Sequence, residues 1–178
     1  GYNACLMCYG QTGSGKTHTL TGPPGALDAL DPDAMTAGNV PISAGVVPRA
    51  LAQVLSSAAP SGVTLTVTAQ YVQIYREKVT CLISGDDVTL RSTAAGGGGG
   101  GGERGEEEQQ QQQTLLVGAT ETTLRDAGEA LASLRAGEAR RAVASTAMND
   151  RSSRAHTALV LRLTQQRNTQ RRRRRHHH

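Results

Sequence analysis

The sequence has 178 residues, of which 37% are hydrophobic, and it contains neither Phe nor Trp. This length predicts one domain. The net charge of +4 comes from five consecutive arginines at 171–175, because the rest of the chain has 14 Lys and Arg against 15 Asp and Glu. A near-neutral body argues against a specific nucleic-acid partner. No apolar run has membrane-spanning length, and we expect no secretory signal.

Three cysteines, Cys5, Cys8 and Cys81, predict reduced thiols in a cytosolic protein, because their number is small and odd. Cys5 and Cys8 form a C-x-x-C pattern, which is compatible with metal or redox chemistry. Both lie in an apolar run that predicts a strand, however, and residues three apart on a strand point to opposite faces. We therefore expect both to be small buried side chains with a structural role.

A glycine-rich loop at residues 10–17, GQTGSGKT, fits the phosphate-binding pattern G-x-x-x-x-G-K-[ST]. It follows the apolar run at 4–9, which predicts a buried strand, and precedes a predicted helix at 16–21. This strand–loop–helix order is the context that a phosphate-binding loop requires. Lys16 would reach the β- and γ-phosphates, and the Thr17 hydroxyl would ligate Mg²⁺. The start of the helix adds the positive end of its dipole.

The next segments alternate between a long loop, a helix and a strand. Residues 22–44 are rich in Gly, Pro, Asp and Ala, which predicts a long loop that is either functional or disordered. Apolar residues at helical spacing predict an amphipathic helix at 45–55. Alternating apolar and Thr residues predict a strand at 63–75, with a bend or bulge near Gln70, where the alternation shifts phase. Residues 76–83 would continue this strand to a sheet edge.

The stretch 92–113 contains successive Gly, Glu and Gln tracts. These tracts cannot bury a core, so we expect disorder there. Order should return at 115–117, and residues 157–164, TALVLRLT, predict another strand. The polar chain from 165 onward ends in runs of Arg and His, which predict a flexible tail.

Two helices are predicted between these strands. The first begins at Asp126, a preferred type of N-cap residue with Glu129 three positions later, and it stops at Gly137. The second covers 138–144, with its two arginines, Arg140 and Arg141, on the solvent side.

Residues 149–156, Asn-Asp-Arg-Ser-Ser-Arg-Ala-His, form a second candidate constellation between a predicted helix and a predicted strand. A Ser hydroxyl can complete the ligand shell of Mg²⁺, and a neighbouring group can position an attacking water. Alone, this pattern is also typical of a polar loop with a helix cap. Together with the phosphate-binding loop, it predicts a nucleotide site.

Four segments resemble the kinesin motor domain, and they occur in that family's order. They are GYNACLMCYGQTGSGKTHTLTG at 1–22, GVVPRAL at 45–51, VTAQYVQIYREKV at 67–79 and STAMNDRSSRAHTALVLRL at 145–163. The resemblance implies an α/β fold of the three-layer P-loop NTPase type. Its central sheet would be mixed, mainly parallel, flanked by helices and incomplete at both ends. It also implies ATP and Mg²⁺ as cofactors, microtubules as partner, and a cytoplasmic, cytoskeletal location.

The same resemblance assigns roles to the residues of the phosphate-binding loop. Those that would bind ATP are Gly10, Gln11, Thr12, Gly13, Ser14, Gly15, Lys16, Thr17 and His18. Within this set, Thr17 would also ligate Mg²⁺, and His18 would lie against the adenine.

In the second constellation, Asn149 would open the switch I segment. Ser152 would help to hold the lytic water, and Ser153 would approach Mg²⁺. Arg154 would form a latch to an acidic residue of switch II. Ala155 departs from the usual Ser, so one hydroxyl contact would be missing, and we expect a mild perturbation of the loop.

The switch II pattern of kinesins, D-x-x-G-x-E, does not occur in these residues. Residues 126–129, Asp-Ala-Gly-Glu, resemble it superficially, but they start an amphipathic helix and follow no buried strand. We therefore expect the central part of a longer motor domain, at 1–165, with insertions at 22–44 and 92–113 and a basic tail at 166–178. We do not expect steady ATP hydrolysis from this part alone.

Two alternatives to an active motor stay open. One is a truncated or degenerate kinesin that binds nucleotide or microtubules without productive ATPase cycling. The other is a different P-loop protein, such as a small GTPase or a transport ATPase, against which the segment 149–156 argues. A homodimeric parent is compatible with the resemblance.

Overall fold

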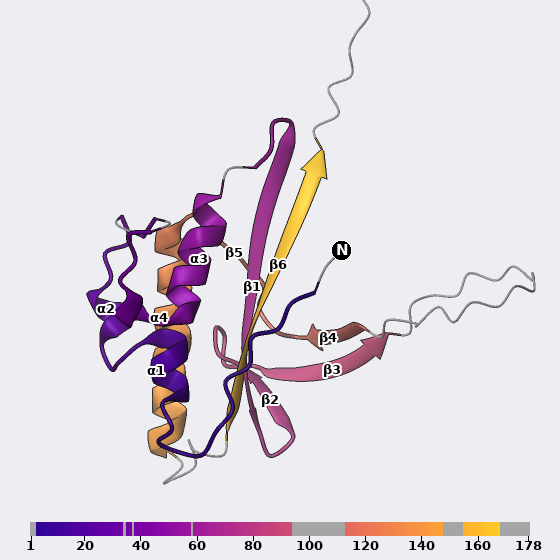
Figure 1. Ribbon diagram of the computed structural model, residues 1–178. Coiled ribbons are helices and arrows are strands. Elements are labelled where there is room, and N and C mark those ends of the chain that lie inside the picture. Colours follow the sequence, from indigo (N-terminus) through magenta and orange to yellow (C-terminus); the bar gives the residue numbers. More distant parts are fainter. Residues whose placement is uncertain are drawn as a thin grey trace, which may run out of the picture.

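The computed structural model describes residues 3–33, 35–36, 38–57, 59–93, 113–147 and 155–167. In chain order its elements are α1 (Lys16–Thr21), α2 (Ala26–Ala29), the 3-10 helix η1 (Ile42–Ala44), α3 (Val46–Ser56), β1 (Val63–Tyr75), β2 (Lys78–Cys81), β3 (Asp87–Thr93), β4 (Gln113–Val117), β5 (Thr122–Thr123), α4 (Ala127–Ala147) and β6 (His156–Arg167). Figure 1 shows the long β1–β6 pair beside the helices, with β3 and β4 projecting to the other side. None of the described helices combines the length and apolarity of a membrane-crossing segment.

The long strand β1 is the centre of the sheet. It pairs with β6 along one side, from Val63 opposite Arg167 to Ile74 opposite His156. Along its other side it pairs with β2 and β5, and β3 and β4 extend the sheet from β2. Every pairing among the described strands is antiparallel. The described residues therefore form an α/β fold without the mainly parallel sheet that we expected, because hairpins and a reversed β6 connect its strands.

The strand predicted at 63–75 is confirmed as β1, but the bulge predicted near Gln70 is wrong. The register with β6 does not shift anywhere along the pair. The apparent change of phase has another cause, since Tyr71 and Val72 are both buried. Tyr71 faces α4, whereas Val72 packs on the opposite side among the strands of the hairpins.

The chain reverses after Tyr75 instead of continuing as a strand to residue 83. Arg76 and Glu77 have positive φ values of 49° and 64°, and Tyr75 pairs with Lys78. Two central residues with positive φ make a tight turn whose twist matches that of the flanking strands. The segment 76–83 therefore contains a hairpin turn and β2, and the prediction of a continued strand is wrong.

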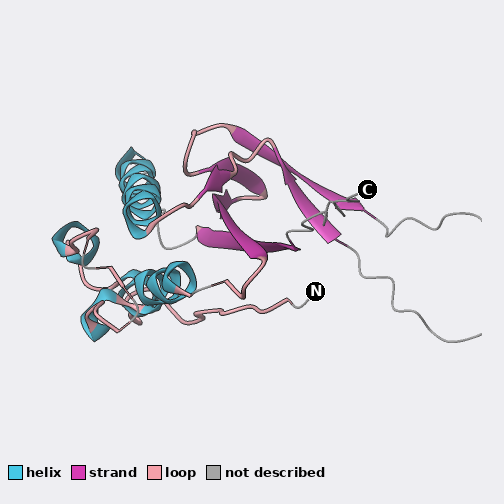
Figure 2. Ribbon diagram, turned by 90° about the horizontal axis from the view of Figure 1, so that it is seen from above, coloured by secondary structure: helices cyan, strands magenta, loops and turns pink. Residues whose placement is uncertain are grey.

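The described helices lie on one face of the sheet, as the view from above shows (Figure 2). The helix predicted at 45–55 is confirmed as α3. The main core lies between the helices and the sheet, and its most buried members include Leu51, Ala52, Val67, Ala69, Leu131 and Leu134. Burying apolar side chains between two layers is what stabilises such an arrangement.

Helix α4 begins as the sequence predicts, but it does not stop at Gly137. The backbone N–H of Glu129 donates to Asp126 Oδ1 at 2.8 Å, which confirms the cap. The helix then runs through Gly137 to Ala147. Gly137 is buried, and a Cβ there would overlap the ring of Tyr71. This glycine therefore serves close packing on β1 and is not a helix stop.

The two arginines of the predicted second helix both have partners in the fold. Arg140 is exposed, yet its guanidinium donates to the carbonyl oxygens of Leu82 and Ile83 at 3.1 and 3.2 Å. Arg141 is half-buried and forms an ion pair with Glu138. The prediction that both face solvent is thus wrong for Arg141.

The insertion at 22–44 contributes α2, η1 and buried side chains to the helix layer. Leu27 and Leu30 belong to the main core. Arg135 of α4 donates hydrogen bonds of 2.9 to 3.0 Å to three carbonyl oxygens, those of Leu27, Asp28 and Leu30. The described part of this insertion is therefore packed on α4 and is not a bare loop.

Candidate functional site

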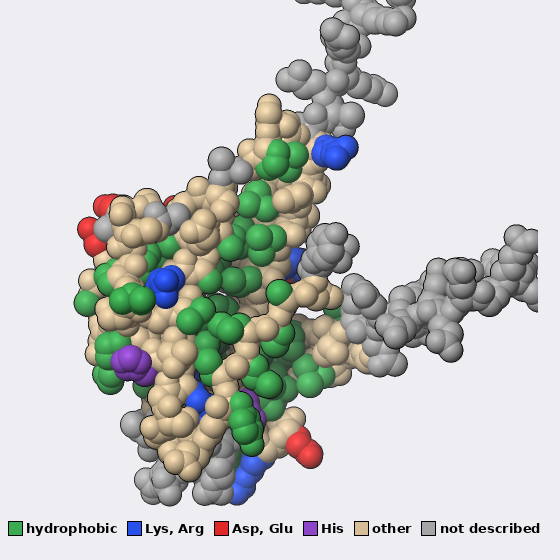
Figure 3. All heavy atoms as spheres, viewed as in Figure 1, with side chains coloured by type: hydrophobic (Ala, Val, Ile, Leu, Met, Phe, Trp, Pro, Cys, Tyr) green, Lys and Arg blue, Asp and Glu red, His purple; other side chains and the backbone are tan. Residues whose placement is uncertain are grey.

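The segment before the phosphate-binding loop is not the buried strand that its apolar composition predicts. Residues 3–10 have no regular secondary structure, and Leu6, Met7 and Tyr9 are 63%, 79% and 94% exposed. Figure 3 shows apolar side chains across the face over which this segment runs. A strand needs a paired neighbour for its backbone groups, and none of the described strands pairs with this segment. For the same reason the prediction of a buried Cys5 is wrong, since Cys5 is exposed, whereas Cys8 is partly buried.

The phosphate-binding loop depends on glycine at three positions. Gly10, Gly13 and Gly15 have φ values of 156°, 79° and 88°, a region that residues with a side chain rarely adopt. A Cβ on Gly10 would also lie 2.6 Å from Ser14 Oγ. The backbone of Gly15 then accepts from the N–H of Thr19 at 2.8 Å and starts α1.

The ammonium group of Lys16 lies across the loop. Its Nζ donates to the carbonyl oxygens of Gly10 and Gln11 at 2.8 and 2.7 Å. A cation held by loop carbonyls, beside glycines that allow close backbone approach, fits the phosphates of a nucleotide. Thr17 and His18 follow on the first turn of α1, and both are exposed.

Two glycines close the insertion behind this loop. A Cβ on Gly45 would lie 2.6 Å from the backbone nitrogen of Gly22 and 2.7 Å from the carbonyl oxygen of Leu20. The chain therefore leaves the end of α1 and returns to the start of α3 at one place. Helix α1 has only six residues, and α3 supports it from this point.

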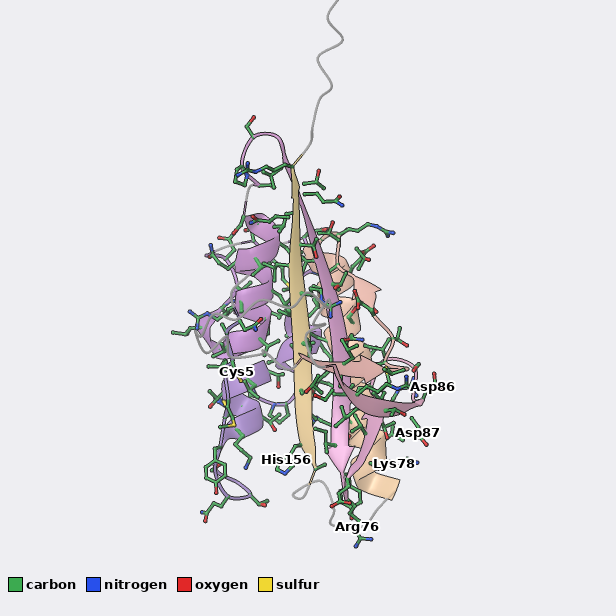
Figure 4. All side chains as sticks on the ribbon, turned by 90° about the vertical axis from the view of Figure 1, so that its right-hand side faces the viewer. Cys5, Arg76, Lys78, Asp86, Asp87 and His156 are labelled. Atoms are coloured by element: carbon green, nitrogen blue, oxygen red, sulfur yellow. The ribbon has the colours of Figure 1, made fainter. Side chains whose placement is uncertain are left out.

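The residues predicted to complete the site, Asn149, Ser152, Ser153 and Arg154, lie outside the described residues. Their flanks are described, because α4 ends at Ala147 and Ala155 precedes β6. Figure 1 shows the phosphate-binding loop, the end of α4 and the start of β6 at the same end of the molecule. His156 is exposed there, near the hairpin turn at Arg76 (Figure 4). The fold thus brings the flanks of the second constellation to the end that carries the loop.

A buried polar group near this end was not predicted. The Tyr71 hydroxyl donates to Glu138 Oε1, and Glu138 Oε2 accepts from Nε and Nη2 of Arg141 at 2.9 and 2.6 Å. Glu and Arg three residues apart on a helix were the visible signal. The partner from β1 could be found only from the tertiary structure.

The described residues contain no group of three or more His, Cys, Asp or Glu side chains that could hold a metal ion. Of the two predicted protein ligands, Thr17 is exposed at the start of α1, and Ser153 is outside the part that the structure describes.

Comparisons with known proteins agree with this geometry. A sequence model of the kinesin motor domain matches residues 1–178. Kinesin-like protein cut7 of Schizosaccharomyces pombe is 34% identical over 163 residues, which are 92% of this chain and 13% of that protein. Carboxy-terminal kinesin 2 of Xenopus laevis is 33% identical over 167 residues, which are 92% of this chain and 22% of that protein.

The fold is similar as well. A solved structure of a fast kinesin matches with a TM-score of 0.65 at 29% identity, covering 89% of this chain and 38% of that one. The chain thus spans 13% and 22% of the lengths of the two relatives named above. With a P-loop NTPase-like α/β fold, a glycine-shaped phosphate loop and a family match over its whole length, the chain belongs to the kinesin motor domain family.

Proposed function

We propose that this chain is the ATP-binding core of a microtubule motor that couples ATP hydrolysis to movement along microtubules. One observation carries the proposal, namely the ammonium group of Lys16 across a loop with three positive-φ glycines. This loop occurs in a chain that the kinesin motor domain matches at residues 1–178. Backbone N–H groups of residues 10–15 would bind the phosphates, and Lys16 would neutralise their charge. His18 would contact the adenine.

Residues of the phosphate-binding loop and of the segment 149–154 would bind Mg²⁺ and position the attacking water. Thr17 and Ser153 would ligate Mg²⁺. The bound ion would neutralise charge that develops on the phosphates. Asn149 and Ser152 would position the water, and Arg154 would pair with a carboxylate of switch II. The end of α4 and the start of β6, which flank this segment, lie at the same end of the molecule as the phosphate-binding loop (Figure 1). This arrangement supports the proposed roles.

The longer protein would act on microtubules in the cytoplasm, as part of the cytoskeleton, either alone or as a homodimer. Its complete motor domain would contain the mainly parallel, three-layer sheet. In this proposal residues 1–165 belong to the motor domain and 166–178 to a basic tail, whose first two residues, Gln166 and Arg167, complete β6. The chain alone would bind nucleotide but would not hydrolyse it steadily.

A second candidate is a degenerate kinesin module that binds nucleotide or microtubules without cycling. The observation that favours it is Ala155 in place of the usual Ser, immediately before β6. Loss of one hydroxyl would remove one hydrogen bond, worth about 1 kcal/mol. A loss of this size slows a cycle more readily than it abolishes binding.

Titration of the 178-residue chain with a fluorescent ATP analogue in the presence of Mg²⁺ tests nucleotide binding. We expect saturable binding that unlabelled ATP displaces at lower concentrations than GTP. A preference for GTP would instead favour a small-GTPase type of protein. If neither nucleotide binds, both kinesin proposals lose the property on which they rest.

A further inference from the structure

The hydroxyl of Tyr71 joins the two elements that flank residues 148–154. Tyr71 is only 6% exposed, and its hydroxyl donates to Glu138 of α4. Tyr71 also pairs with Leu159 of β6, and the side chain of Thr157 on the same strand acts to lower the pKa of the hydroxyl. One buried group on the central strand thus contacts the helix that precedes the segment and the strand that follows it.

The surroundings of this hydroxyl keep it protonated, so that it can donate a hydrogen bond. Burial raises the pKa of Tyr71 far above its ordinary value, and the negative charge of Glu138 raises it further. Burial alone would lower the pKa of Arg141, but hydrogen bonds and the charge of Glu138 outweigh burial and raise it. The Tyr71 phenol and the Arg141 guanidinium therefore both keep their protons at neutral pH.

The contact also fixes how far α4 can slide along β1. Gly137 leaves room for the Tyr71 ring, which a Cβ would overlap. Positions one helical turn away from Gly137 carry Ser133 and Arg141, and both have a Cβ. The corresponding positions for Glu138 carry Leu134 and Ala142, which offer no side-chain acceptor. A one-turn shift of α4 would therefore create a clash and leave the buried hydroxyl without its acceptor.

We propose that Tyr71 is a positioning residue, which holds the end of α4 and the start of β6 at a fixed separation beside the proposed nucleotide site. This inference rests on the proposed function, because it assigns Tyr71 to the same reaction. Tyr71 itself touches no nucleotide in it. The hydroxyl acts through the two flanks, and the ring acts as the spacer on Gly137.

Tyr71→Phe removes the hydroxyl and keeps the ring. Tyr75→Phe is a matched control on the same strand and face, because among the described residues Tyr75 Oη is buried without a hydrogen-bond partner. In the 178-residue chain, we expect Tyr71→Phe to speed amide hydrogen exchange at residues 142–147 and 156–161 several-fold. Tyr75→Phe should leave both segments unchanged. Equal exchange in Tyr71→Phe and the unsubstituted chain would overturn the inference, whether or not nucleotide binds.

The second readout is ATP turnover by the longer protein. We expect Tyr71→Phe to lower kcat roughly tenfold, since small displacements of reacting groups cost up to about a hundredfold. The KM for ATP should stay within about twofold, because Lys16 and its loop do not contact Tyr71. Glu138→Gln keeps an acceptor for the hydroxyl and should retain more kcat than Glu138→Ala. An active longer protein whose kcat is unaffected by Tyr71→Phe contradicts the positioning role, whereas no turnover in the unsubstituted protein contradicts the proposed function.

Discussion

Replacing Lys16 by alanine weakens binding of MgATP to the chain roughly 10- to 100-fold, since a hydrogen bond to a charged group is worth about 1.5–3 kcal/mol. The ammonium group lies 2.8 and 2.7 Å from the carbonyl oxygens of Gly10 and Gln11. It is therefore already at the place where phosphate oxygens would meet the loop. No other Lys occurs in residues 1–77, so no neighbouring ammonium group can replace it.

The measurement is the same fluorescent titration, with Lys78→Ala as the control. Lys78 pairs with Asp87 at 3.0 Å on the surface of the hairpin, and both side chains are more than half exposed. Figure 4 shows this pair on β2 and β3. An exposed ion pair contributes about 0–1 kcal/mol to stability, so Lys78→Ala should bind nucleotide as the unsubstituted chain does. Equal affinities for Lys16→Ala and Lys78→Ala would show that the loop does not bind the phosphates.

Replacing Gly137 by alanine destabilises the fold by about 1–3 kcal/mol, the usual cost of forcing extra volume into a packed core. The direction of this change in stability is informative, because alanine in place of glycine within a helix normally stabilises the helix by roughly 1 kcal/mol. Here the added Cβ would overlap the ring of Tyr71. That ring is buried and tied to Glu138 through its hydroxyl, so it has little freedom to move aside.

Chemical denaturation of the 178-residue chain measures this effect, with Gly128→Ala on the same helix as the control. A Cβ on Gly128 would lie 3.2 Å from Asp126 Oδ1 and 3.6 Å from Pro32 Cβ. These contacts can be relieved by small movements, so Gly128→Ala should cost far less than Gly137→Ala. A Gly137→Ala chain as stable as the unsubstituted one would mean that α4 does not pack on Tyr71.

Elements governed by local patterns were predicted well from the sequence. The helix at 45–55, the strand at 63–75 and the cap at Asp126 follow from spacing and side-chain chemistry within a few residues. The loop glycines were predicted for the same reason, since each needs its conformation locally. Such features depend little on the rest of the chain.

Elements that depend on distant partners were predicted poorly. Residues 4–9 have the composition of a strand, but no described strand pairs with them, and all except the partly buried Cys8 are exposed. Gly137 has the chemistry of a helix stop, yet packing on Tyr71 overrides that preference. The turn at Arg76 and Glu77 uses two residues with side chains at positive φ, which composition alone does not indicate.

The candidate site likewise has one part that depends on local sequence and one part that depends on distant contacts. The loop at 10–17 is local, and its role could be proposed from eight residues. The link from Tyr71 to Glu138 joins residues 67 positions apart, and spacing along the sequence cannot indicate such a contact. We propose that this link positions the helix and the strand that flank residues 148–154.

The central claim is that this chain is the nucleotide-binding part of a microtubule-stimulated ATPase. It is tested most directly by measuring ATP turnover of the longer protein with and without microtubules, beside its Lys16→Ala variant. We expect slow turnover without microtubules, a severalfold or greater increase with them, and loss of both rates in the variant. Turnover that microtubules do not change, or that survives in Lys16→Ala, would contradict it.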